Sequence, residues 1–344
     1  MKIVLSKKMV FFNVFFKTLG FFAAFILVFI IFNIIVFLIT DNTRNDFIFK
    51  EGDKNSNNII ALVNLNGPIV NNINGILKNN IFSFIDPKEL KTNIDQLLKI
   101  EPKILVVKIN SPGGTVSATH ELEIIFKNFK KNSQTKIYFI TEEILASGAY
   151  WVATSGDKIY ANYGSIIGSI GVSGPSWYYY NNPVSISSGL FGETITTENG
   201  IEIYNQNSGK SKDLFNPFRK PTEKEIVHLQ SMVDEIYTKF VNNVSKKRNI
   251  ETSFIKNEIG ALIYTSEQAK NNYLIDDILN YDDLIKVIIT ENNFKNYKII
   301  QNKNKINFFQ KYLSSYIDNN FNKIVCKNLI SNFVTIMPGY FNSC

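Results

Sequence analysis

The run from Thr18 to Thr40 limits most strongly what this chain can fold into, because Asn33 is its one clearly polar residue. About 20 apolar residues cross the hydrocarbon core of a bilayer as a helix. The run is longer than the roughly 7–15 apolar residues of a cleaved signal peptide, and no A-x-A cleavage site follows it. We therefore expect a transmembrane anchor at 18–40, preceded by a cytoplasmic or interfacial N-terminus at 1–17.

The charges on either side of this run predict its orientation. Lysines precede it and mainly acidic residues follow it: Lys2, Lys7, Lys8 and Lys17 before, and Asp41, Arg44 and Asp46 after. Positive charges collect on the cytoplasmic side of a spanning helix. The sequence therefore predicts a single-pass protein of the cell membrane, with a cytoplasmic N-terminus and an extracytoplasmic domain beyond about residue 41.

The net charge of +7 does not by itself indicate a nucleic-acid partner. Four lysines belong to the flank of the apolar run, and the others are dispersed among many asparagines. Basic and aromatic residues do not interleave as they do on a nucleic-acid-binding surface. We therefore expect the membrane, and no nucleic acid, as a partner.

Strand and helix patterns alternate between residues 58 and 286. Continuous apolar runs and apolar residues at helical spacing predict, in chain order, a strand at 59–65, a helix at 87–100, strands at 104–109 and 136–140 with a helix at 118–130 between them, and a short strand at 158–160. This alternation predicts an α/β domain with a largely parallel sheet and flanking helices. We expect a polar linker at 41–57 before the domain and an extension of unknown role at 287–344 after it.

Two capping boxes mark further helices. Thr222 with Glu225 opens a helix over 223–247, and Thr265 with Gln268 opens a short one. Apolar residues recur along the longer helix at steps of three and four: Ile226, Leu229, Val233, Ile236 and Phe240. This stripe is a packing face, either against the sheet or against a neighbouring subunit.

Four short motifs follow one another in the domain: 110–114 (NSPGG), 145–151 (LASGAYW), 168–172 (GSIGV) and 209–213 (GKSKD). Ser147 lies between small residues, which let a carbonyl group approach, and the helix expected to start there directs backbone N–H groups toward it. We expect oxyanion donors in the N–H of Ser147 and in that of Gly113 or Gly114. The motif pattern is therefore that of a nucleophilic serine.

A serine hydroxyl needs an adjacent base, and the chain has only two histidines, both outside these motifs. Lys212 is the candidate base, provided that burial stabilises its neutral form and that Asp213 points elsewhere. Ser169, 22 residues after Ser147 and 43 before Lys212, has a hydroxyl that could hold the amine in place. Lys210 is the rival base, because residues two apart in an extended segment share a face.

Over roughly residues 57–285, these motifs resemble the short, single-domain bacterial form of signal peptide peptidase A, a family of membrane-anchored serine peptidases with the Clp-protease/crotonase fold. The resemblance implies that Ser147 is the nucleophile, Lys212 the general base, Ser169 the lysine-orienting hydroxyl, and Gly113 or Gly114 an oxyanion donor. It implies an endopeptidase that degrades cleaved signal peptides or other membrane-associated peptides through an acyl-enzyme. It also implies ring-shaped homo-oligomers, some with the dyad shared between subunits, and neither a cofactor nor a metal.

Two features depart from the family pattern. Glu142 and Glu143 precede the serine where smaller residues are usual, and the 65-residue interval between Ser147 and Lys212 is longer than usual, with its extra length around Tyr178–Tyr204. These features bear on substrate preference more than on chemistry.

Other functions and pairings stay open at this stage. A non-catalytic, membrane-anchored ring scaffold would fit if Lys212 did not reach Ser147. An acyl-CoA enzyme of the crotonase type would explain neither the anchor nor the serine–lysine pair. Cys326 and Cys344 form a disulfide or remain two unpaired thiols, and an exported domain permits either.

Overall fold

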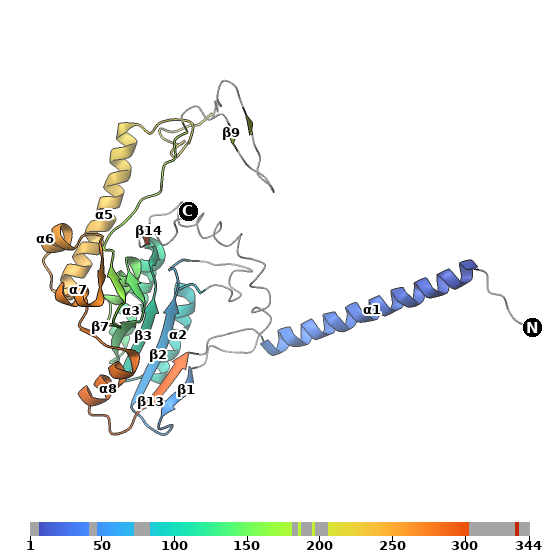
Figure 1. Cartoon of the computed structure of the whole chain (residues 1–344), viewed down its shortest axis with the longest axis horizontal. Coiled ribbons are helices and arrows are strands. Elements are labelled where there is room, and N and C mark those ends of the chain that lie inside the picture. The colour runs from blue at the N-terminus through green and yellow to red at the C-terminus, as the bar shows by residue number, and fades with distance from the viewer. Residues whose placement is uncertain are drawn as a thin grey trace, which may run out of the picture. The chain divides into compact units, whose positions relative to one another are not determined.

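The computed structural model describes residues 7–40, 47–71, 83–180, 185–186, 195–196, 206–302 and 334–336. A long apolar helix, α1 (Lys7–Thr40), forms the first of two units, Met1–Asp46 (Figure 1). Its 23-residue stretch Phe11–Asn33 is long and apolar enough to cross a membrane. The amide of Asn33 donates to the Phe29 carbonyl at 2.7 Å, so the helix satisfies this polar side chain itself. The prediction of one N-terminal apolar helix is confirmed, and the helix begins before residue 18.

The second unit, Phe47–Cys344, is built on a seven-stranded sheet (Figure 1). The strand order is β1 (Phe47–Gly52), β13 (Lys298–Asn302), β2 (Ile59–Asn66), β3 (Ile104–Asn110), β5 (Lys136–Thr141), β7 (Lys158–Ala161) and β12 (Asp277–Ile278). All neighbouring strands are parallel except β1 and β13. The predicted α/β fold with a largely parallel sheet is therefore confirmed.

The central strands are apolar on both faces because helices cover both faces. Along β2, Ala61 and Val63 face a core shared with α2 (Pro87–Ile100), α3 (Val116–Asn132) and α4 (Gly148–Ala153). Their neighbours Ile60 and Leu62 face a second core under α8 (Tyr281–Glu291). Apolar residues of two motifs, among them Leu145, Ala149 and Ile170, also pack in the first core.

The remaining helices begin where their capping residues predict. Both capping boxes form, at Thr222 before α5 (Glu223–Arg248) and at Thr265 before α7 (Ser266–Asn271). Between them lie α6 (Thr252–Phe254) and the π-helical turn η2 (Ile255–Ile259).

The domain extends past both boundaries predicted for it. Residues 47–52 lie within the expected linker, but they form β1, which pairs with β13. Beyond residue 286, α8 continues to Glu291, and β13 inserts between β1 and β2. The linker is therefore shorter than expected, and part of the C-terminal extension belongs to the sheet.

Short strands outside the main sheet surround the motifs. One three-stranded sheet has the order β11 (Ile263–Thr265), β8 (Ile166–Gly168) and β6 (Ile144–Ala146), and β4 (Gly113–Thr115) pairs with β14 (Val334–Ile336). Within 173–207, where strands and loops were expected, a ribbon forms from β9 (Ser185–Ile186) and β10 (Ile195–Thr196). Cys326 and Cys344 lie outside the described residues.

Candidate active site

Ser147 is the single residue between β6 and α4, and its backbone is strained. Its φ of 55° and ψ of −120° are rare for a residue with a side chain, and such a conformation costs about 1–3 kcal/mol. A sharp strand–turn–helix connection of this kind presents a nucleophile at the helix N-terminus. Among the described serines, Ser147 is the one that combines a positive φ with a position between a strand and a helix N-terminus.

The hydroxyl of Ser147 is also buried without a partner. The residue is 1% exposed, and its Oγ has no hydrogen bond among the described residues. Leaving a buried hydroxyl unsatisfied costs about 1–3 kcal/mol. Two unfavourable features thus coincide at one side chain, which is typical of a functional site rather than a packing position.

The N–H of Ser147 is not directed at a substrate, contrary to the expectation from sequence. It donates to the carbonyl of Gly168 at 2.7 Å, the contact that joins the end of β6 to the end of β8. The next N–H groups, those of Gly148 and Ala149, lie in the first turn of α4, where a helix offers no acceptor of its own. These groups are the donors available beside Ser147.

The same contact brings Ser169 next to the nucleophile. Ser169 directly follows Gly168, is 2% exposed and has a φ of 53°. Its N–H donates to the carbonyl of Leu262 at 2.7 Å. No hydrogen bond among the described residues joins the Ser169 hydroxyl to Ser147 or Lys212, so the backbone alone brings the two serines together.

The glycine motif is tied to Ser147 through Ser111. The Ser111 N–H donates to the Ile144 carbonyl at 2.8 Å, and its carbonyl accepts from the Ala146 N–H at 3.2 Å. The side chain of Asn110 then accepts from the N–H groups of Glu142 and Glu143 and from Thr141 Oγ1, at 2.9–3.0 Å. Sequence reasoning did not assign Asn110 a role, although it begins the motif.

The backbones of Gly113 and Gly114 make different contacts. The Gly113 N–H donates to Ser111 Oγ at 3.2 Å, and its carbonyl accepts from the Ile69 N–H at 2.9 Å. A Cβ on Gly114 would lie 1.9 Å from the Ile69 carbonyl oxygen, so this close approach requires glycine. Because Gly113 and Thr115 both bond to Ile69, the N–H of Gly114 points to the opposite edge of β4. That edge of β4 pairs with β14, and the role of either glycine as an oxyanion donor stays a prediction.

Lys212 lies in an exposed turn, 209–215, that precedes α5. Its N–H donates to the Gly209 carbonyl at 3.2 Å, and its side chain is exposed. Among the described residues no hydrogen bond joins Lys212 to Ser147 or Ser169. Lys210 is exposed as well, so the structure of one protomer brings neither lysine to the serine.

Arg219, which sequence reasoning did not single out, organises this turn. Its guanidinium binds the carboxylate of Asp213 at 2.6 and 2.8 Å and that of Glu225 at 2.9 Å. The hydrogen bonds from Arg219 lower the pKa of both carboxyl groups. Asp213 therefore has a partner other than Lys212, and Glu225 links the turn to the capping box of α5.

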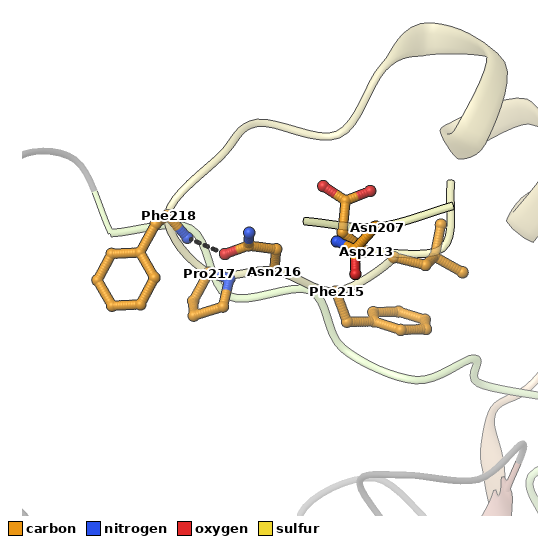
Figure 2. A pocket seen from close by; sticks show the side chains of 7 residues that line it. Asn207, Asp213, Phe215, Asn216, Pro217 and Phe218 are labelled. Carbon is orange, nitrogen blue, oxygen red and sulfur yellow. Dashed lines mark hydrogen bonds between the residues drawn. The ribbon is translucent and has the colours of Figure 1, made fainter. Parts of the chain in front are cut away.

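Aromatic residues cover the same turn. The Trp177 ring lies 5.3 Å from that of Phe215 and 5.1 Å from the Arg219 guanidinium, and its Nε1 donates to the Asn216 carbonyl at 3.1 Å. Asn207 and residues 213–218 line a surface pocket here, in which the Asn216 side chain turns back to the N–H of Phe218 (Figure 2). The lysine-bearing turn is thus an ordered surface.

The packing of α5 changes along its length. At its C-terminal end Phe240 is fully buried and stacks on Trp151, with ring centroids 4.6 Å apart. Near its N-terminal end Ile226 is 52% exposed, so the described part of the protomer leaves this residue of the predicted stripe uncovered. The C-terminal end of the stripe therefore packs in the first core, which was one of its two predicted partners. Its N-terminal end is exposed and open to the other predicted partner, a neighbouring subunit.

Neither histidine replaces Lys212 as a base. His120 bonds to the buried Glu123 at 3.0 Å and lies 3.4 Å from the ammonium of Lys239. His228 is exposed on α5. Around Glu123, the hydrogen bonds from Lys127 and His120 outweigh burial and lower its pKa, which is typical of a structural ion network.

The chain belongs to the S49 family of peptidases. Residues 129–295 match the model of peptidase family S49. The chain is 30% identical over 255 residues to "Putative signal peptide peptidase SppA" of Enterococcus faecium, covering 72% of this chain and 69% of that protein. It is 31% identical over 199 residues to "Putative protease MJ0651" of Methanocaldococcus jannaschii, covering 58% of this chain and 59% of that protein.

Solved structures of proteases also match. They include a mutant of the 1510-N membrane-bound stomatin-specific protease in complex with a substrate peptide, at 14% identity and a TM-score of 0.41, covering 76% of this chain and 98% of that chain. The ClpP catalytic domain from Plasmodium falciparum matches at 17% identity and a TM-score of 0.35, covering 64% of this chain and 85% of that chain.

Proposed function

We propose that this S49 peptidase is a membrane-anchored serine endopeptidase with a Ser147–Lys212 dyad, which degrades cleaved signal peptides or other membrane-associated peptides. The observation that carries the proposal is Ser147 itself, a strained and buried serine whose hydroxyl is unpartnered at the N-terminus of α4. The apolar stretch Phe11–Asn33 supports a membrane anchor, and the lysines before it support an extracytoplasmic catalytic domain.

In the proposed mechanism Ser147 Oγ attacks the carbonyl carbon of the scissile peptide bond while Lys212 Nζ takes its proton. The N–H groups of Gly148 and Gly114 stabilise the oxyanion that develops. The protonated lysine then gives the proton to the leaving amine, and an acyl-enzyme remains on Ser147. Water, deprotonated by the same amine, hydrolyses the acyl-enzyme, with Ser169 orienting the lysine in both steps.

The exposed position of Lys212 favours a dyad shared between two copies of the chain. A lysine acts as a base where its surroundings exclude water and favour the neutral amine. The uncovered apolar end of α5, near Ile226, supports a neighbouring subunit on the same side as the lysine turn. We therefore propose a ring in which Lys212 of one subunit reaches Ser147 of the next.

The direct test of the proposed activity compares the detergent-solubilised protein with its Ser147→Ala variant on a synthetic signal peptide, with products identified by mass spectrometry. Ser155→Ala is the matched control, because Ser155 is also buried but donates to the Val152 carbonyl at 2.6 Å. We expect cleavage by the wild type and by the control only. Equal cleavage by the Ser147→Ala variant would reject Ser147 as the nucleophile.

A mixing experiment tests the shared dyad. Ser147→Ala and Lys212→Ala subunits, each inactive alone, are dissociated, mixed in equal amounts and reassembled. In a symmetric ring with the dyad shared between subunits, about one quarter of the sites regain both residues. A mixture that stays inactive although the rings have reassembled would place both residues of each dyad in one subunit.

A further inference from the structure

The ion network around Glu123 lies against the helix that follows the nucleophile. Glu123 is on α3, is 2% exposed, and pairs with Lys127 at 2.6 Å and with His120 at 3.0 Å. α3 contacts α4, and an apolar residue at this position would pack there without the cost of taking a carboxylate out of water. The buried charge therefore indicates a contact that an apolar side chain could not make.

That contact is with the indole of Trp151, on α4. The indole Nε1 is buried without a close hydrogen bond among the described residues, and it faces the carboxylate of Glu123. Burial raises the pKa of Glu123, but the hydrogen bonds from Lys127 and His120, and after them the Trp151 indole, hold this pKa below its ordinary value of 4.5. The indole N–H thus lies beside an ionised acceptor, the kind that forms the stronger hydrogen bonds.

Trp151 in turn supports the connection that presents Ser147. Its backbone N–H donates to the Ser147 carbonyl at 3.0 Å, which is the first hydrogen bond of α4. Its ring stacks on Phe240 of α5, with the two planes 20° from parallel. The strained backbone of Ser147 persists only where its surroundings fix it. Trp151, held on its ring face by α5 and at its ring edge by α3, is one such support.

We propose that Glu123 is a positioning residue, which holds the Trp151 indole in one orientation and thereby keeps the backbone of Ser147 in its strained conformation. Stacking on Phe240 fixes the plane of the ring, and the attraction between the indole N–H and a carboxylate fixes its rotation within that plane. Glu123 acts through Trp151 and takes no part in the steps that break bonds. The inference rests on the proposed function only for the reaction in which its effect on turnover is measured.

Spectroscopy and hydrogen exchange test the contact without any substrate. The chain has two tryptophans, so in Trp177→Phe the ultraviolet resonance Raman band that reports indole hydrogen bonding belongs to Trp151 alone. Glu123→Leu should shift this band toward that of a free indole. It should also speed amide exchange in residues 148–154, measured by mass spectrometry, about tenfold. The matched control is Glu121→Gln, an exposed carboxylate on the same helix, which should change neither.

Turnover of the synthetic signal peptide then separates positioning from packing. Glu123→Leu leaves His120 and Lys127 free to hydrate, because their side chains are 39% and 47% exposed, so the urea midpoint should change little. We expect its kcat to fall about 10- to 100-fold and its KM to stay within about twofold, because Ser147 is misplaced. Glu123→Gln keeps an acceptor of the same shape and should recover part of the loss.

The possible results separate this inference from the proposed function. An unshifted Raman band, unchanged amide exchange, or a wild-type kcat in folded Glu123→Leu would overturn the inference. If Glu123→Leu does not fold, the Raman band of Glu123→Gln, whose neutral amide is a weaker acceptor, decides in its place. If the wild type cleaves no signal peptide, the proposed activity fails, while the Raman and exchange measurements still decide whether Glu123 holds Trp151 and the start of α4.

Discussion

The two halves of the proposed dyad differ in how much of their surroundings one protomer supplies. Ser147 is buried between β6 and α4; its N–H donates to Gly168 in β8, and Ser111 bonds to the residues of β6 just before it. Lys212 is exposed on a turn that an ion network and an aromatic cluster hold in shape. The comparison teaches that the described residues bury Ser147 within one protomer, whereas they leave Lys212 exposed on an ordered turn with no hydrogen bond to Ser147.

The largest effect is expected from removing the lysine itself. Lys212→Ala should lower turnover about 10²- to 10⁴-fold, because the serine loses its proton acceptor. The matched control is Lys210→Ala, on the same turn and equally exposed, which should stay within about twofold of the wild type. Both variants should unfold at the wild-type denaturant concentration, since surface substitutions change stability by about 0.5 kcal/mol at most. The reverse pattern of turnover would make Lys210 the base.

The two ends of α5 provide a second contrast, in stability. Phe240→Ala removes a fully buried ring that stacks on Trp151, and should lower the free energy of unfolding by about 3–5 kcal/mol. Ile226→Ala, at the exposed end, should change it by about 0.5 kcal/mol or less. Urea denaturation of each variant measures both values. A large loss for Ile226→Ala in a dissociated protomer would show that this end already has a partner within the chain.

Arg219 connects the lysine turn to α5, so its removal should displace Lys212 without unfolding the domain. Arg219→Ala frees Asp213 and Glu225, and we expect turnover to fall about 10- to 100-fold through misplacement of Lys212. Arg219→Lys keeps the charge but lacks the planar fork that binds two carboxylates, so it should restore only part of the rate. Steady-state kinetics of each variant measure kcat and KM separately. An effect on KM alone would place Arg219 in substrate binding.

Much of the fold was predictable because its signals are local. The helix 87–100 has Asp86 as its N-cap and Pro87 in its first turn, and it has the bounds predicted from its apolar spacing. The strands 104–109 and 136–140 are continuous apolar runs, as buried parallel strands require. In contrast, β1 and β13 have only two or three consecutive apolar residues each, and their pairing joins segments about 250 residues apart, which no local pattern predicts.

The site was predictable in its residue types but not in its hydrogen bonds. The sequence identified Ser147 from its small neighbours and its place before a helix. It could not show that Gly168 takes the Ser147 N–H, or that Ile69 approaches Gly114, because both contacts arise between short segments distant in sequence. Nor could it show that Lys212 stays exposed in the protomer, since burial of a long side chain depends on what lies across from it.

The smallest effect is expected when the lysine turn is exposed to acid. This experiment tests the turn alone. Arg219 lowers the pKa of Asp213 below its ordinary 3.8 and that of Glu225 below its ordinary 4.5. A depressed pKa in the folded state means that the ion network stabilises the turn above these ordinary values, and that this stabilisation is lost as the pH falls from them through the lowered values. The turn should therefore stay intact between pH 7 and pH 5 and loosen below about pH 4.

Tryptophan fluorescence can follow this change, because the chain has only two tryptophans and Trp177 stacks on the Arg219 guanidinium. The difference between the wild type and Trp177→Phe isolates the signal of the turn from that of the buried Trp151. Arg219→Ala, which lacks the network, should show no acid transition in this difference signal. A transition near neutral pH, or one that survives Arg219→Ala, would mean that other groups order the turn and that its shape at the working pH is not set by Arg219.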